Sequence, residues 1–391
     1  MKHYSHLSAL FIVKASLSYA VMLLSLNSVT AQSLTPEFVT AGYTLTNLGS
    51  IEGLPTQYGG LTIRPEQPDI LYIGGSANYG SGALYTVPLI RDPETFNITG
   101  FGGAAEAYTL TPNIDGGVYF APNGTLLFTR YSMNEIGQIL PDQTYTSTPL
   151  NPLGVSSSVG SLAFVPYGYP GAGNLIVSSY SASVLYQIPF TIEGSGLYNF
   201  SGQSAEVSVA ETSSGPEGIA YIPSGSLAFP NPSMAISSYD LGKVVVFEVG
   251  NHGLPVNETA REMLTGLTGA EGALIDPVTG DFLFSTFGGG NKVVRISGFK
   301  APNSANNRLL ADNPLFRIYP NPCEGICTLE LKSPLSPGII EIHNVLGEQL
   351  SSLVLQKTPL QKIDLSNLPA GLYIVKVKNE LGTGFSRIIR Q

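Results

Sequence analysis

Short apolar runs separated by turn residues dominate the middle of the chain. Five of these runs begin with glycine, and a proline follows each of them within two residues. Proline cannot donate a hydrogen bond to a neighbouring strand, so it ends the strand and begins a turn. The glycines are 57, 43, 58 and 54 residues apart, which indicates one repeated unit. The runs are residues 60–63, 117–120, 160–164, 218–222 and 272–275.

Three further strands accompany each apolar run. A second and a third strand follow it, and a weaker fourth strand precedes its glycine. Four short strands at this period are typical of the blades of a β-propeller. We therefore predict an all-β chain with a five-bladed propeller over residues 32–299. The second strands are expected at 70–73, 126–129, 175–178, 234–237 and 282–285; the third at 83–88, 137–140, 184–188, 244–249 and 292–296; the fourth at 43–48, 107–111, 145–148, 206–210 and 263–267.

Two alternatives to this architecture stay open. A propeller of six blades would result if the loops at residues 90–103 or 190–202 contain weak strands. A β-sandwich is the other fold that many short strands can form, although a regular period with a constant internal order favours the propeller.

The first 31 residues have the pattern of a secretory signal peptide. Lys2 and Lys14 supply positive charge, residues 17–26 are apolar, and Val29-Thr30-Ala31 fits a small-residue cleavage site. The apolar run is too short to span a bilayer as a membrane anchor, and no later segment is long enough. We expect an exported chain whose mature form has no transmembrane segment.

Charge separates the chain into two parts. The net charge is −9, which argues against nucleic acid as a partner because phosphate binding needs a basic face. Residues 32–313 contain 9 basic and 22 acidic side chains, whereas residues 314–391 contain 8 and 6. Residues 300–314 are rich in Asn, Ala and Pro and lack periodicity, so we predict a linker there.

The last part of the chain has its own motifs. Phe316-Arg317-Ile318-Tyr319-Pro320-Asn321-Pro322 comes first, residues 364–375 read DLSNLPAGLYIV, and the chain closes on a basic end with Arg387 and Arg390. Alternating apolar and polar residues at 339–343 and 373–378 predict half-buried strands. We predict a small Ig-like β-sandwich of about seven strands over residues 315–391.

In this order, the motifs resemble the type A sorting domain of the type IX secretion system of Bacteroidetes. The resemblance implies that residues 315–391 engage the type IX secretion machinery and carry the protein across the outer membrane. In that family the domain is usually cleaved off, and the cargo is released or joined to surface polysaccharide. We expect a protein that is secreted or attached to the outer cell surface.

Cys323 and Cys327 depart from this family pattern and are the only cysteines of the chain. An exported pair at this spacing is a candidate for a local disulfide. The alternative is two reduced thiols, because a continuous strand from one cysteine to the other would hold the two Cα atoms too far apart.

Acidic residues precede the strand-opening glycine in three of the five repeats: Asp115, Glu217 and Glu271. The inner strands of a propeller converge on a central channel, so these carboxylates are candidates for one shared site. Oxygen ligands from several blades suit Ca²⁺ or Mg²⁺. The other interpretation is that each acid accepts hydrogen bonds from backbone N–H groups of its own turn.

Hydroxyl and aromatic residues recur after the second strands, as Ser178-Ser179-Tyr180, Ser237-Ser238-Tyr239 and Thr129-Arg130-Tyr131. They either line one face of the propeller or pack between blades. Tyr rings can stack on sugars or peptides while their hydroxyls bind them. We therefore take Tyr131, Tyr180, Tyr239 and Arg130 as candidate ligand-binding residues.

The Pro216-Glu217-Gly218 turn before an apolar strand resembles the NHL, gluconolactonase and strictosidine-synthase-like propellers. In the gluconolactonase group, the resemblance implies, a metal ion polarises a lactone carbonyl and activates water. No Ser/His/Asp triad is indicated, because His252 is the only histidine between residues 7 and 342. The leading hypothesis is binding of an extracellular glycan, peptide or small molecule, and the alternative is a metal-dependent hydrolase or lactonase.

Overall fold

The structure, a computed structural model, describes residues 32–301 and 316–391, apart from residues 66, 122, 123, 167, 194, 332–337, 345–348, 357, 380 and 381. The predicted signal peptide and residues 302–314 of the predicted linker lie outside the described residues. The described chain forms two β domains with one short α-helix, α1 (Pro36–Thr40). Within these residues, no helix is long and apolar enough to cross a membrane.

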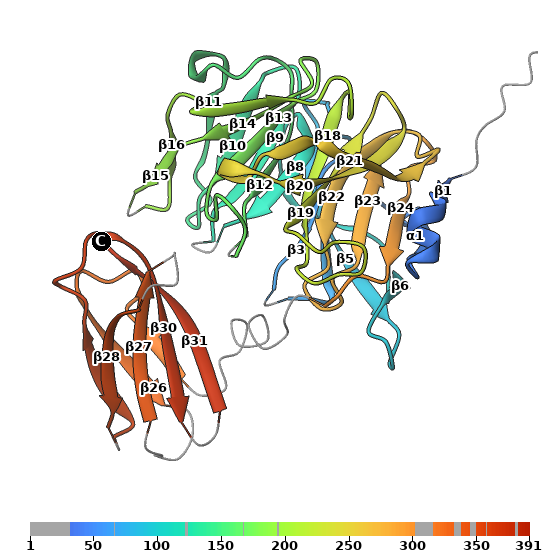
Figure 1. Ribbon diagram of the computed structural model, residues 1–391. Helices are drawn as coiled ribbons and strands as arrows, with labels where there is room; N and C mark the ends of the chain where they lie inside the picture. Colours follow the sequence, from blue (N-terminus) through green and yellow to red (C-terminus); the bar gives the residue numbers. More distant parts are fainter. Residues whose placement is uncertain are drawn as a thin grey trace, which may run out of the picture. The chain divides into compact units, whose positions relative to one another are not determined.

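The first domain is the predicted propeller, and its described residues form five four-stranded blades (Figure 1). Each blade runs from an inner strand at the centre to an outer strand at the rim. From inside to outside, the blades are β3 (Leu61–Ile63), β4 (Ile70–Gly75), β5 (Ala83–Arg91) and β7 (Glu106–Leu110); β8 (Ile114–Phe120), β9 (Leu126–Arg130), β10 (Glu135–Ile139) and β11 (Tyr145–Pro149); β12 (Val159–Phe164), β13 (Leu175–Ser179), β14 (Val184–Ile188) and β17 (Ala205–Ser208); β18 (Pro216–Ile222), β19 (Ser233–Ser238), β20 (Lys243–Val249) and β21 (Pro255–Thr265); β22 (Ala270–Ile275), β23 (Phe282–Thr286), β24 (Val293–Ser297) and β2 (Thr44–Gly49).

The two loops that were candidates for a sixth blade form hairpins instead. β6 (Ile98–Phe101) pairs with the far end of β5, and β15 (Phe190–Ile192) pairs with β16 (Tyr198–Phe200). The count of five blades therefore holds for the described residues.

The predicted fourth strands are weak in sequence because they lie at the rim. β7, β11 and β17 have no buried residue, whereas β13, β19 and β23 are buried along their whole length between neighbouring blades. Every fourth strand except the first is the outer strand of the blade that precedes it in the chain. The first of them, β2, pairs with β24 and closes the ring between the two ends of the domain.

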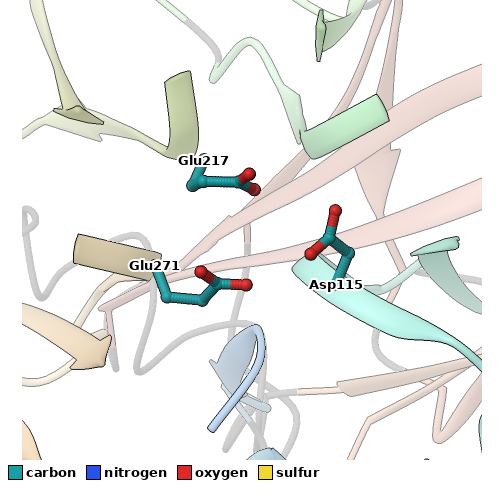
Figure 2. A group of neighbouring side chains, drawn as sticks. All are labelled: Asp115, Glu217 and Glu271. Carbon is teal, nitrogen blue, oxygen red and sulfur yellow. The ribbon is translucent and has the colours of Figure 1, made fainter. Parts of the chain in front are cut away.

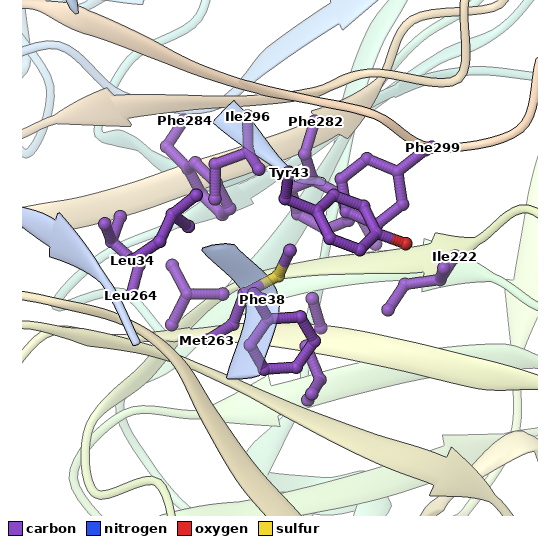
Figure 3. Close-up of a cluster of buried hydrophobic side chains, with 14 of the residues drawn as sticks. Leu34, Phe38, Tyr43, Ile222, Met263, Leu264, Phe282, Phe284, Ile296 and Phe299 are labelled. Carbon is purple, nitrogen blue, oxygen red and sulfur yellow. The ribbon is translucent and has the colours of Figure 1, made fainter. Parts of the chain in front are cut away.

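The start of the domain reinforces this closure. β1 (Ser33–Leu34) pairs with β21 of the fourth blade, and α1 follows it. Phe38 of α1 is fully buried, with its ring stacked 5.7 Å from Phe229 and edge-on 5.8 Å from Tyr43. Figure 3 shows this cluster, in which Phe38 of α1 packs with buried side chains of blades four and five.

The recurring glycines are required by the close approach of the inner strands, which contact one another in the cyclic order β3, β8, β12, β18, β22 and β3. A Cβ atom on Gly218 would lie 2.5 Å from the carbonyl oxygen of Glu271. A Cβ atom on Gly272 would lie 2.6 Å from the Cα atom of Gly60. Both spacings are too short for any side chain, so glycine is the residue that permits this packing.

The second domain is the predicted sandwich of seven strands in two sheets. One sheet has the order β25 (Phe316–Tyr319), β26 (Ile326–Leu331), β29 (Leu360–Asp364). The other has the order β28 (Gln349–Leu355), β27 (Gly338–Asn344), β30 (Gly371–Asn379), β31 (Gly382–Arg390). Alternate residues of both sheets form one core, which includes Ile340, Ile342, Val375 and Ile363. Cys323 and Cys327 lie in this core as free thiols.

Candidate metal centre

Three carboxylates meet at the centre of the propeller. Asp115 comes from β8, Glu217 from β18 and Glu271 from β22. One oxygen of each lies within 4.8 Å of the others, and the three carboxylates point toward a common point (Figure 2). Their exposed fractions are 1%, 4% and 2%, so all three are buried. The structure thus brings together the three acids that the sequence singled out.

A local irregularity in each inner strand aims these side chains at the axis. The register of β18 against β19 shifts between Pro216 and Gly218, where Glu217 lies. Similar shifts surround Glu271 in β22 and Asp115 in β8. A β-bulge bends a strand and redirects the side chain at its extra residue, which explains why these acids leave the blade surface.

Glycines in the other blades make room for the two glutamates. The positions that correspond to Glu217 and Glu271 are Gly59, Gly116 and Gly160, because in every blade the residue two positions later pairs with the equivalent residue of the second strand. A Cβ atom on Gly116 would lie 3.0 Å from Glu217 Oε2, and one on Gly160 would lie 2.9 Å from it. The Glu217 carboxylate therefore occupies volume that these glycines leave free.

These carboxylates lack the partners that buried charges normally have. In the described part of the chain, Glu217 Oε2 and Glu271 Oε1 are buried without a hydrogen-bond donor, and Asp115 Oδ1 and Oδ2 have none of good geometry, although Asn78 and the N–H of Gly116 lie close enough to lower the pKa of Asp115. None of the described ion pairs includes these residues. For Glu217 and Glu271, this arrangement does not favour the interpretation in which the acid only caps its own turn.

Burial raises the pKa of all three carboxyls well above their usual range. The neighbouring carboxylates raise the pKa of Glu217 and Glu271 further by repulsion. A divalent cation between the oxygens would reverse this effect and hold all three ionised. Ca²⁺ takes oxygen ligands at about 2.3–2.6 Å, so two ligands on opposite sides lie about 5 Å apart. The observed spacing fits such an ion, and a donor set made only of oxygens suits Ca²⁺ or Mg²⁺.

Tyr180 and Tyr239 directly follow the second strands of adjacent blades, and their rings meet edge-to-face at 5.9 Å. The Tyr180 hydroxyl donates a hydrogen bond of 2.9 Å to Asp240. Burial raises the pKa of Tyr239, and the charges of Glu271 and Glu217 raise it further. Tyr131, in the same position of the second blade, also raises the pKa of Tyr239. All three tyrosines are half-buried.

Phe287 extends this aromatic arc and was not singled out from the sequence. Its ring lies 6.5 Å from that of Tyr239. The signal was present, because Ser285-Thr286-Phe287 repeats the pattern Ser237-Ser238-Tyr239 one blade later. A search restricted to tyrosine overlooks it.

The hydroxyls beside these rings hold neighbouring blades together. Thr129 Oγ1 accepts a hydrogen bond from Gly117 N at 2.9 Å and donates one to Gly160 O at 2.7 Å. Ser237 makes the same pair of bonds with Gly218 N and Glu271 O, and Ser285 donates to Gly59 O at 2.6 Å. These side chains connect one inner strand to the next and are not free to bind a ligand.

Arg130 is engaged within its own blade. Its guanidinium pairs with Glu135 and donates a hydrogen bond of 3.0 Å to Pro112 O. We therefore leave Arg130 out of the site proposed below.

The cation-free propeller should be more stable at about pH 5 than at about pH 8. A carboxyl whose pKa is raised by folding contributes stability that is complete below its unfolded pKa and is lost as the pH rises through its folded pKa. The three axial carboxyls act in this direction, as does Asp281, whose pKa burial raises from 3.8 to about 6. Thermal unfolding in a chelator across this range measures the effect. A midpoint that is highest at pH 8 would contradict it.

Comparison with known families identifies the second domain. Residues 317–391 match the family described as "Secretion system C-terminal sorting domain". This match confirms the prediction made from the motifs between Phe316 and Arg390. Among curated proteins, none matches the chain in sequence.

Solved structures with a similar course of the chain include several enzymes and one binding protein. Virginiamycin B lyase from Staphylococcus aureus is 14% identical, with 65% of this chain and 99% of that chain covered and a TM-score of 0.36. Aldose sugar dehydrogenase from Streptomyces coelicolor is 14% identical, with 64% and 83% covered and a TM-score of 0.35. An auxiliary nutrient binding protein from Bacteroides thetaiotaomicron is 9% identical, with 65% and 76% covered and a TM-score of 0.39. These values are too low to attach a ligand or a reaction to this chain.

Proposed function

We propose that this exported protein binds an extracellular ligand through a divalent cation held at the propeller axis. The premise is that residues 317–391 are a secretion system C-terminal sorting domain. The sorting domain makes the protein secreted or attached to the cell surface. The ligand-binding role belongs to the propeller, which the secretion machinery delivers.

One observation is the main support for a bound cation. The buried carboxylates of Asp115, Glu217 and Glu271 lie within 4.8 Å of one another without a positive partner. Three ionised groups in such a place would repel one another and lose their hydration, at a cost of several kcal/mol per ion. A bound Ca²⁺ or Mg²⁺ removes both penalties. The same penalties make a cation-free state with three charges unfavourable at neutral pH.

The chemistry around the cation favours a neutral ligand rich in hydroxyl groups. Three carboxylates and one divalent ion leave a formal charge of −1, and Asp240 adds another acid beside Tyr180. An anionic ligand would be repelled there. Tyr180, Tyr239 and Phe287 offer half-buried rings on which a sugar ring can stack. Sugar hydroxyls can also replace water on Ca²⁺, which accepts six to eight oxygen ligands.

A metal-dependent hydrolase or lactonase is the second candidate. The observation in its favour is the buried set of oxygen donors from Asp115, Glu217 and Glu271, which would hold the divalent cation that such chemistry needs. The cation would polarise the carbonyl of an ester or lactone.

Metal analysis and ligand screening of the full-length exported protein test this proposal. We expect about one equivalent of Ca²⁺ or Mg²⁺ per chain in the wild type, and none in Glu217→Gln or Glu271→Gln. Glu258→Gln removes an exposed carboxylate of β21 and should bind as the wild type does. A glycan array with and without chelator should show binding only with the cation. Failure of the wild type to bind any divalent ion would overturn the proposal, and lactone turnover lost in the two axial variants would select the hydrolase.

A further inference from the structure

The two cysteines of the chain meet inside the sorting domain. Cys323 and Cys327 are each 1% exposed and share one hydrophobic core. The backbone bends at Glu324 and Gly325, and Gly325 has φ +133°, so the cysteines lie on two segments rather than on one continuous strand. The bend removes the objection that an extended chain would keep their Cα atoms apart.

The two thiols are neighbours within this core. Burial raises the pKa of Cys327 to about 12, and the charge and hydrogen bond of the adjacent Cys323 thiol add to the shift. Cys327 Sγ also lies 3.7 Å from the carbonyl oxygen of Ile363, to which it donates. No other cysteine competes for either thiol, because the chain has two.

Cys323 also forms backbone hydrogen bonds with the last residues of the chain. Its N–H donates to Ile389 O at 2.8 Å, and its carbonyl accepts from Gln391 N at 2.9 Å. This segment therefore continues the four-stranded sheet beyond β31, whereas Cys327 belongs to β26 of the three-stranded sheet. A bond between the two sulfurs would connect the two sheets at the C-terminus.

We propose that Cys323 and Cys327 form a disulfide as the domain folds outside the cytoplasm, and that this bond fixes the last residues of the chain to the opposite sheet. The oxidant is a thiol–disulfide reagent, RS–SR. One cysteine thiolate attacks RS–SR and releases RS⁻; the second attacks the mixed disulfide and releases another RS⁻. Both cysteine protons pass to the two RS⁻ groups, giving two RSH, and the two cysteines lose two electrons to the reagent.

Burial sets the time at which this reaction takes place. A thiol whose pKa is far above neutral has little thiolate and reacts slowly, so the folded, reduced domain resists oxidation. The bond forms while the segment is still accessible, and the core then shields it from reductants. Export places the folding chain in a compartment where disulfides persist.

Thiol counting on the full-length chain tests the bond. The chain is recovered from the periplasm of an expression host and from the reducing cytoplasm, then unfolded with N-ethylmaleimide and weighed. We expect no added maleimide on the exported chain before reduction and two after it, and two on the cytoplasmic chain from the start. Cys323→Ser and Cys327→Ser should each take up one maleimide without reductant. Two maleimides on the unreduced exported chain, or a bond found only between two chains, would overturn the proposal.

Carboxypeptidase digestion tests what the bond does. Release of Gln391 and Arg390 should be several-fold slower from the oxidised chain than from the reduced chain. The two serine variants should behave as the reduced chain does. Equal release rates in the oxidised and reduced forms would show that the bond does not hold the C-terminus.

Discussion

Glu217→Gln should raise the unfolding midpoint of the propeller in chelator at pH 8 and abolish its stabilisation by Ca²⁺ or Mg²⁺. Glutamine keeps the shape of the side chain and removes one of three mutually repelling charges, which is worth roughly 1–3 kcal/mol for a buried group without a partner. The wild type should gain about 2.7 kcal/mol when the free cation is a hundred times its dissociation constant. Differential scanning calorimetry with chelator and with added cation measures both effects on the propeller transition.

A higher unfolding midpoint in chelator, together with the loss of stabilisation by the cation, distinguishes a metal ligand from an acid with a purely structural role. If the Glu217 carboxylate only accepted hydrogen bonds, its replacement by glutamine would lower the unfolding midpoint of the propeller both in chelator and with added cation. Glu258→Gln, an exposed carboxylate on the outer strand β21, should leave both midpoints unchanged. A lower midpoint of Glu217→Gln in chelator would show that the carboxylate is stabilised by the protein itself, and the cation proposal would fail.

The sequence predicted the five blades because strand order and turn residues are local properties. The positions of prolines and apolar runs are sufficient to place the four strands of each repeat. The reason for the glycines was not accessible, because two of the atoms that exclude a side chain at Gly218 belong to Glu271 and Ala273, in the next blade. Similarly, β2 looks like the start of the first repeat but completes the last blade, since ring closure is a property of the whole domain.

The acids and the hydroxyls of the site also differ in how far local sequence could predict their role. Convergence of Asp115, Glu217 and Glu271 followed from topology, because all three lie at the start of an inner strand. Their lack of partners did not, since it depends on every side chain around the axis. The hydroxyl of Ser237 looked like part of a ligand surface beside Tyr239, yet its acceptor is a carbonyl of the next blade. A local pattern identifies which residue types recur, but their partners must come from the fold.

Gly160→Ala should destabilise the propeller and weaken cation binding together. A Cβ atom at this position would overlap the carbonyl oxygen of Pro216 and lie 2.9 Å from Glu217 Oε2. The backbone of β18 cannot move away without separating the inner strands, so overpacking of about 1–3 kcal/mol is expected. The displaced Glu217 carboxylate should lower cation affinity at least tenfold, which corresponds to about 1.4 kcal/mol.

Gly100→Ala is the matched control, because a Cβ atom on Gly100 would meet no other atom within 4 Å. Chemical denaturation and cation titration of the two variants separate the general effect of adding a methyl group from crowding at the axis. A Gly160→Ala protein with wild-type stability and cation affinity would mean that β12 and β18 can separate without cost. The glycines at the axis would then not be what creates the space for Glu217, and the link between the inner-strand packing and the metal centre would be lost.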